Sequence, residues 1–289
     1  KMRKVITFIL FLFFFSVLSH AQNVERPALY GIAKMTYRIS NFDLAQSYYG
    51  EFLGFSKAFS YSGKEGTIDS YKINNRQFLE FVEDKNASLK KRLVSVSFET
   101  ENAQKMQEYL LSKGVALDRD VYIDGAGNKV LLTHDPSGIP IEFIQYMPGS
   151  KHVKSMGRFL SSERIATRIH HVGLYSKQML ENPEFYTQIL GFQLILRIPE
   201  DRNVEPKLLY FRIPESAEMI EHYPSPDENF NHPCFVTMDM QETYSILRTR
   251  KKTEVLPPPG MGMGKRWLLN IWNQDGTKVE FTEPYMSIF

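Results

Sequence analysis

The chain has 289 residues, of which 43% are hydrophobic and 24% are charged, and its formal net charge is +2. This is the composition of an ordinary globular protein, long enough to form about two domains. The small net charge and the scattered lysines and arginines give no indication of nucleic-acid binding. Cys234 is the only cysteine of the sequence, which excludes an internal disulfide.

The first 21 residues have the pattern of a secretory signal peptide. A basic start over residues 1–4 precedes an apolar run over residues 5–18, and Ser19-His20-Ala21 supplies small residues for cleavage. We therefore expect export to a periplasm or out of the cell. An uncleaved membrane anchor is the alternative, whereas a lipoprotein would need a cysteine at the cleavage point. No later segment reaches the ~20 apolar residues of a transmembrane helix, so no stable membrane span is expected after the signal is removed.

The first domain is expected over residues 31–147. A strand over residues 33–40 leads into an amphipathic helix over residues 44–53, and Gly54 is suited to end that helix. The pattern then restarts, so that the order βαβββ occurs twice. The remaining predicted strands are 55–61, 67–73, 77–82, 93–99, 130–133 and 141–146, and the second predicted helix is 103–111.

A linker over residues 148–164, without a regular hydrophobic period, precedes a second domain over residues 165–289. This domain is expected to repeat the order of the first. Its predicted strands are 168–175, 192–197, 208–213, 217–222, 232–238, 267–272 and 278–282, and its predicted helices are 183–190 and 242–250. Residues 257–264 are rich in proline and glycine, which predicts a surface connection or, alternatively, a mobile lid over a site.

The two halves are copies of one another. Gly191 follows Gly54 with an offset of 137 (191 − 54), and Glu280 follows Glu142 with an offset of 138 (280 − 142). A fixed offset over most of a chain indicates a duplicated domain. We therefore predict an α+β fold of two tandem domains, each a pair of βαβββ modules that form an open, curled mixed sheet, or cup.

The second half carries a set of side chains that suits a metal ion. The strands that line such a cup bring His171, Glu221, His232 and Glu280 toward one another. Two imidazoles and two carboxylates are ligands for one divalent ion of Fe, Mn, Ni, Co or Zn. Carboxylates buried in strands are also costly unless they are paired or bound to metal. Met35 is expected at the position of His171 in the first half, which would confine the metal to the second.

Three segments of the second half resemble the signature of the vicinal oxygen chelate superfamily. They are His171-Val-Gly-Leu-Tyr, Phe185-Tyr-Thr-Gln-Ile-Leu-Gly-Phe192 and Asp275-Gly-Thr-Lys-Val-Glu280. That superfamily contains glyoxalases, methylmalonyl-CoA epimerases, extradiol dioxygenases, fosfomycin-type resistance enzymes and bleomycin-binding proteins. The resemblance implies that the metal ligands of the first, fourth, fifth and last strands are His171, Glu221, His232 and Glu280.

In the first domain, the resemblance implies a degenerate site. The equivalent positions are Met35, Glu80, a residue at or near Leu93 to Ser95, and Glu142. Both imidazoles are missing there, so no tight metal site is expected, and the two carboxylates are expected at the surface or in hydrogen bonds. This layout is similar to that of two-domain extradiol dioxygenases.

Several assignments have alternatives. His170 could replace His171, and His222 could replace Glu221 if the strand register slips by one residue. His232 precedes a proline at a strand start, where a capping histidine would also be ordinary. A structural role is expected for the other histidines, which are His20, His134 and His152. Four aromatic residues could line the cup, although a core position is the simpler expectation for them: Tyr210, Tyr223, Tyr244 and Trp272.

The expected function is an exported, metal-dependent enzyme that acts on a small oxygen-bearing metabolite. With Glu221 as fourth ligand, the resemblance implies lyase or isomerase chemistry in which this carboxylate serves as base. Without it, the remaining ligands suit Fe(II) and an extradiol dioxygenase. A non-catalytic protein that binds a small molecule in the cup is the third hypothesis. Whether the domains dock within one chain or two chains form a homodimer is left open.

Overall fold

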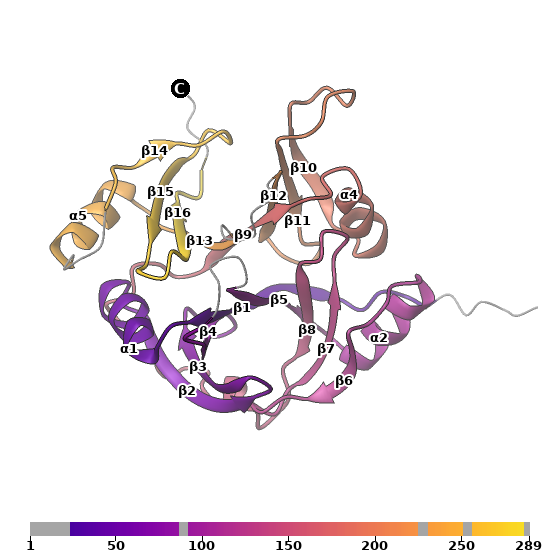
Figure 1. Ribbon diagram of the computed structural model, residues 1–289, viewed down its shortest axis with the longest axis horizontal. Helices are drawn as coiled ribbons and strands as arrows, with labels where there is room; N and C mark the ends of the chain where they lie inside the picture. Colours follow the sequence, from indigo (N-terminus) through magenta and orange to yellow (C-terminus); the bar gives the residue numbers. More distant parts are fainter. Residues whose placement is uncertain (1–23, 87–91, 225–230, 251–255, 286–289) are drawn as a thin grey trace, which may run out of the picture.

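The computed structural model describes residues 24–86, 92–224, 231–250 and 256–285 (Figure 1). The predicted signal peptide, His20 included, lies outside these ranges. Within them, no helix combines the length and the apolar character that crossing a membrane would require.

The first sheet has eight strands in the order β2-β3-β4-β1-β5-β8-β7-β6. Strands β1 and β5 pair antiparallel at its centre and join two βαβββ modules, while β1 pairs with β4, and β5 with β8, in parallel. The strands are β1 (Leu29–Ile39), β2 (Ser56–Gly63), β3 (Gly66–Lys72), β4 (Phe78–Glu83), β5 (Leu93–Thr100), β6 (Arg119–Ile123), β7 (Lys129–His134) and β8 (Pro140–Gln145). Of these, β6 was not among the predicted strands.

The helices of this domain begin and end as their sequences require. Asn41 caps α1 (Phe42–Ala45) by accepting a hydrogen bond from the Leu44 N–H at 2.8 Å, a typical role for asparagine at this position. The chain continues as a π-helical segment, η1 (Gln46–Phe52), and Gly54 follows with a φ of 76°. Asn102 caps α2 (Ala103–Ser112) in the same way. A short helix, α3 (Lys151–Lys154), lies in the predicted linker.

The second sheet repeats the first, with the order β10-β11-β12-β9-β13-β16-β15-β14. Its strands are β9 (Ile169–Ser176), β10 (Gln193–Ile198), β11 (Leu208–Arg212), β12 (Met219–Pro224), β13 (His232–Val236), β14 (Gly260–Met261), β15 (Trp267–Trp272) and β16 (Lys278–Thr282). Its helical segments are α4 (Asn182–Glu184), which continues as η3 (Phe185–Ile189), and α5 (Met240–Arg250). The predicted α+β fold of two tandem domains, each a curled mixed sheet, is confirmed.

Along the central strands, successive side chains point alternately into the hydrophobic core and into the cup. On β1, Met35 and Tyr37 belong to the hydrophobic core, whereas Lys34 and Thr36 line a cavity inside the curled sheet. Neighbouring residues of a strand point to opposite faces, so a shift of one residue exchanges core and cup. Each cup is therefore lined by every second residue of its strands.

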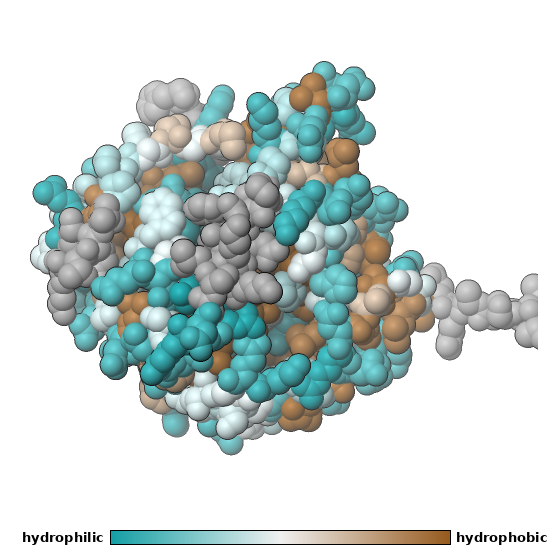
Figure 2. Space-filling view, in the orientation of Figure 1, coloured by the Kyte–Doolittle hydropathy of each residue, from teal (hydrophilic) through white to brown (hydrophobic). Residues whose placement is uncertain are grey.

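The two cups differ in how far they close. Figure 1 shows the first sheet as a nearly closed ring and the second as an open V. The turn after β6 contacts the opposite edge strand β2: a Cβ atom on Gly125 would lie 1.9 Å from the backbone oxygen of Ser62. The outer surface in Figure 2 is mostly hydrophilic, with hydrophobic side chains in small groups.

The domains pack against each other within one chain. The rings of Phe98 in the first domain and Phe192 in the second lie 5.5 Å apart, edge to face. Glu218 reaches from the second domain to the first, where it accepts hydrogen bonds from the Ile32 N–H at 2.5 Å and the Gln77 amide at 2.8 Å. A single core cluster includes residues of both domains. The domains thus dock intramolecularly.

Candidate metal centre in the second domain

Four side chains predicted from the sequence converge inside the second cup. His171 on β9, Glu221 on β12, His232 on β13 and Glu280 on β16 each place one nitrogen or oxygen atom within 4.8 Å of all the others. All four residues are buried. They come from the four central strands of the sheet, so the cluster is held by regular backbone pairing.

Strand register explains this convergence. Gly173 on β9 lies opposite Glu221 on one side and His232 on the other. Gly173 also leaves the room that the imidazole needs, because a Cβ atom there would lie 2.0 Å from Cε1 of His232. Two residues earlier, His171 lies opposite Cys234, which in turn pairs with Glu280.

The arrangement of the candidate ligand atoms suits a shared metal ion better than direct hydrogen bonds between them. His171 Nε2 is 3.1 Å from Glu221 Oε2 and 3.4 Å from Glu280 Oε1. These three buried atoms nevertheless make no well-aligned hydrogen bond within the described part of the chain. Buried polar atoms left in this way are costly, and a divalent ion bound to two nitrogens and two oxygens would satisfy all of them.

The charges of the cluster suit the same ion. Burial opposes ionisation of Glu280, but Lys278 and the two imidazoles lower the pKa of this carboxyl well below its usual value. Burial lowers the pKa of His232, which keeps this imidazole neutral. An ionised carboxylate and a neutral imidazole are the protonation states that bind metals.

His170 lies outside the cluster but orients it. Its Nδ1 atom is 2.9 Å from Nδ1 of His171, and burial together with the charge of His171 lowers the pKa of His170 to about 2. The neutral His170 ring can thus accept the Nδ1–H of His171, which directs the Nε2 atom of His171 into the cup, where a bound metal would displace its proton. Metal-binding histidines commonly donate their second N–H in this way.

Sequence reasoning missed two further groups beside the cluster. The Lys278 ammonium lies 3.1 Å from Glu280 Oε2 and 3.4 Å from His232 Nε2. Lys278 precedes Glu280 by two residues on β16, and this spacing, which puts both on one face, could have revealed it. Cys234 is buried and free, and burial raises the pKa of its thiol to about 12, so it stays protonated.

A cavity of about 240 Å³ opens from Glu221. Tyr210 and Tyr223 line it, and burial together with the nearby Glu221 raises the pKa of both phenols, which remain protonated. Met263, which lies in the proline- and glycine-rich segment, also lines this cavity. That segment includes β14 and borders the cup, although a surface connection was the simpler prediction.

The other residues named as alternatives lie elsewhere. His222 packs on Tyr186 and Phe211 on the core side of β12, and burial lowers its pKa to about 3. His134 pairs with Asp118 at the surface. Two aromatic residues stay away from the cavity: Tyr244 packs partly buried against the core, and Trp272 is 40% exposed.

One prediction for the first domain is wrong. Met35 is a core residue, and Lys34 takes the position of His171. In the first sheet, Lys34 pairs with Ser97, which pairs with Glu142. In the second sheet, His171 pairs in the same way with Cys234, which pairs with Glu280. The equivalent of His232 is Ser95, which pairs with Thr36. The 137-residue offset seen at Gly54 applies here too (171 − 34) and would have identified Lys34.

The first cup therefore contains an ammonium group where the second has the imidazole of His171. Lys34 Nζ lies 2.7 Å from Glu80 and 3.2 Å from Glu142. Burial opposes its charge, but Glu142 and Glu80 raise the pKa of Lys34 well above its usual value. Both carboxylates are buried, in contrast to the surface position considered for them, and His152 of α3 contacts Glu80 at 3.1 Å.

Comparison with known proteins identifies the family of the second domain. Residues 168–281 match the model of the Glyoxalase/Bleomycin resistance protein/Dioxygenase superfamily. No curated protein matches the chain.

Solved structures share the fold of the whole chain at low sequence identity. The 2,3-dioxygenase LapB from Pseudomonas sp. KL28 is 15% identical, with a TM-score of 0.72 over 90% of this chain and 96% of that one. A Mn(II)-bound glyoxalase from Novosphingobium aromaticivorans is 14% identical, with a TM-score of 0.70 over 89% and 83%. Homoprotocatechuate 2,3-dioxygenase from Brevibacterium fuscum, solved with 3,4-dihydroxyphenylacetate, is 16% identical, with a TM-score of 0.68 over 91% and 82%. The second domain thus matches the model of the Glyoxalase/Bleomycin resistance protein/Dioxygenase superfamily, as the sequence resemblance predicted, and the two domains together share the fold of these solved structures.

Proposed function

We propose that this protein is an enzyme that depends on one divalent metal ion bound by His171, Glu221, His232 and Glu280. The observation that carries the proposal is the convergence of four buried ligand atoms within 4.8 Å, three of them without a well-aligned hydrogen bond in the described residues. The donor set suits Fe, Mn, Ni, Co or Zn. The substrate we propose is a small oxygen-bearing metabolite.

The reaction that this arrangement favours is of the lyase or isomerase type. A divalent ion at the cluster would act as a Lewis acid on substrate oxygen atoms. Glu221 borders the cavity as well as the cluster, so its carboxylate can leave the metal and take a proton from a substrate carbon placed there. The protonated phenols of Tyr210 and Tyr223 can donate hydrogen bonds to substrate oxygens or to Glu221.

An extradiol dioxygenase is the second candidate. The specific observation in its favour is the likeness of the whole two-domain chain to two 2,3-dioxygenases. In this case His171, His232 and Glu280 form the two-histidine, one-carboxylate set that suits Fe(II) and oxygen chemistry. Glu221 would then act beside the substrate. A third candidate, a protein that binds a small molecule without turning it over, uses the same cup.

We further propose that the protein is exported, on the basis of the signal-like pattern in residues 1–21. Export would disfavour glutathione and coenzyme A thioesters as substrates, because both are mainly cytoplasmic. A small aromatic or keto compound fits better.

Metal analysis of the purified protein tests the proposal. We expect about one divalent ion per chain, lost in His171→Ala and Glu280→Ala and retained in His134→Ala, whose surface histidine serves as the matched control. Circular dichroism checks that each variant is folded. Unchanged metal occupancy in both cluster variants would refute the proposed centre.

Activity then separates the candidates. Oxygen uptake with a catechol by the Fe(II)-loaded protein would favour the dioxygenase. Undiminished affinity for a bound small molecule after metal removal would favour the binding protein. If neither is seen, Glu221→Gln distinguishes the lyase or isomerase mechanism, because this variant should keep most of its metal and lose turnover at least 100-fold.

A further inference from the structure

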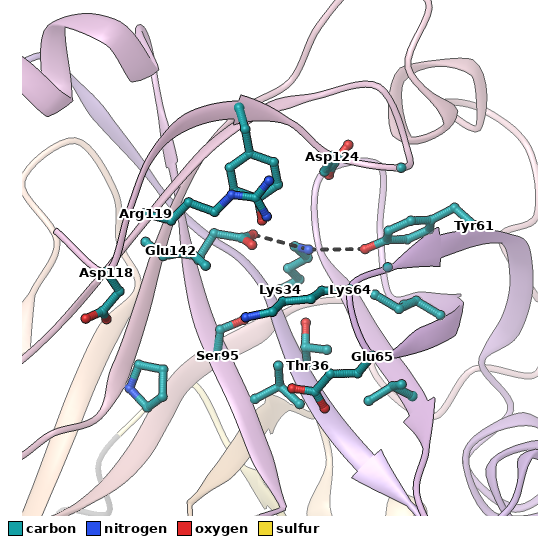
Figure 3. A pocket seen from close by; sticks show the side chains of 18 of the residues that line it. Lys34, Thr36, Tyr61, Lys64, Glu65, Ser95, Asp118, Arg119, Asp124 and Glu142 are labelled. Carbon is teal, nitrogen blue, oxygen red and sulfur yellow. Dashed lines mark hydrogen bonds and ion pairs between the residues drawn. The ribbon is translucent and has the colours of Figure 1, made fainter.

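A large cavity lies in the first cup, away from the proposed metal centre. Its volume is about 600 Å³, which is in the range of small-molecule binding sites. The curled sheet β1–β8 surrounds it, and Figure 3 shows Lys34 at its floor between Glu142 and Tyr61. The cavity of the second cup is smaller, about 240 Å³.

An ammonium group lies at the floor of this cavity, at the position that His171 takes in the second cup. The ammonium of Lys34 contacts Glu80 at 2.7 Å, Glu142 at 3.2 Å and the Tyr61 hydroxyl at 3.4 Å. It thus supplies the positive charge that a metal supplies in a complete cup. Lys34 is 3% exposed, so its side chain is held by these buried neighbours.

Groups that can bind a ligand surround the ammonium. Glu142 reaches the cavity with its carboxylate, and the hydroxyl groups of Thr36 and Ser95 lie on the same floor (Figure 3). Ser95 is 5% exposed. These three residues offer acceptors and donors for hydroxyl groups, while apolar side chains cover the walls: Ile68, Val82, Val94, Leu132 and Ile123.

The charges around the cavity cancel. Four cationic and four anionic side chains line it: Lys34, Arg38, Lys64 and Arg119, and Glu65, Asp118, Asp124 and Glu142. Arg38 pairs with Glu65 at 2.6 Å, and the Arg119 guanidinium lies 3.4 Å from the centre of the Tyr122 ring. A strongly charged ligand of either sign would therefore create an excess of that charge inside the cavity.

We propose that the first cup is a second, metal-independent binding site for an uncharged small molecule with hydroxyl groups on a ring. Its hydroxyl groups would bind Glu142, Thr36 and Ser95, and its ring would pack against the apolar wall. A cyclic sugar and a catechol share this chemistry. The site is separate from the proposed metal centre, so either can fail without the other.

Ligand-observed saturation-transfer NMR on the chelator-treated protein tests this proposal. The probes form two matched pairs of neutral and anionic compounds, catechol with benzoate and D-glucose with D-gluconate. We expect transfer to at least one neutral probe and at least tenfold weaker binding of its anionic partner. The neutral probe that binds shows whether the ligand is a catechol-like or a sugar-like compound.

Variants locate the binding. Ser95→Leu fills the cavity and should weaken binding at least tenfold, and Thr36→Val, which keeps the size of the side chain, should weaken it severalfold. His171→Ala should leave it unchanged. Circular dichroism checks folding, and Thr36→Val alone decides if Ser95→Leu does not fold.

Three outcomes would overturn the proposal. One is no transfer to either neutral probe. Another is equal transfer to neutral and anionic probes. The third is binding that persists in Thr36→Val and is lost in His171→Ala, which would place the ligand in the second cup.

Discussion

Replacement of Lys34 by methionine should strongly destabilise the first domain. The change removes the ammonium but keeps most of the volume of the side chain. Glu80 and Glu142 then remain buried without their shared counter-ion, at positions 0% and 7% exposed. Loss of one partner from a buried ion pair typically costs about 3–5 kcal/mol. We expect a decrease of that size in the free energy of unfolding at pH 7.

The pH dependence of this effect has a definite sign. Burial opposes ionisation of Glu80, but Lys34 and His152 lower the pKa of this carboxyl below its usual value. The stability it contributes is therefore fully present above the unfolded pKa of about 4.3 and is lost as the pH falls through the lowered pKa. The difference between Lys34→Met and the wild type should accordingly be largest at neutral pH and shrink in acid, where Glu80 of the variant is protonated.

The assay is urea unfolding followed by two signals. Both tryptophans, Trp267 and Trp272, belong to the second domain, so their fluorescence reports on that domain, while far-ultraviolet circular dichroism reports on both. The triple variant Lys34→Met, Glu80→Gln, Glu142→Gln should recover part of the loss, because it removes the buried charges together. A stability of Lys34→Met within about 0.5 kcal/mol of the wild type would show that the ammonium does not neutralise this floor.

Three further predictions concern the metal centre and the domain interface. Lys278→Met should tighten divalent-metal binding about tenfold in a chelator competition, because it removes a cation 3.1 Å from Glu280; equal or weaker binding would contradict this. His170→Phe should weaken the same binding about 10- to 100-fold, whereas His222→Phe, equally buried but outside the cluster, should not. Burial raises the pKa of Glu218 to about 7, so wild-type stability should fall as the pH rises from about 4.5 through 7. Glu218→Gln should lack this fall in thermal unfolding, and a parallel pH profile would refute the assignment.

The duplicated architecture could be predicted because its signals are local. The repeated helix ends at Gly54 and Gly191 and the alternation of the strands are visible within short windows. The residues of the second cup could be named for a related reason. Glu221 and Glu280 are carboxylates embedded in predicted strands, a pattern that needs a partner inside the fold.

The first cup was harder to predict. Met35 was predicted at the position that Lys34 occupies. These two residues are neighbours on a strand, so one faces the core and the other faces the cup. His152 comes from a linker without a hydrophobic period, so nothing in its neighbourhood indicated that α3 places it against Glu80. Lys278 was missed although its spacing from Glu280 was visible.

By itself, the sequence determined the order of most elements, the duplication and the types of chemical group available, since these depend on residue type and on periodicity along the chain. Only the tertiary structure decided which groups meet. His171 and Glu280 are far apart in sequence and become neighbours through the pairing of β9, β13 and β16. That pairing is set by the register of whole strands, and the same register places an ammonium in one cup and two imidazoles in the other.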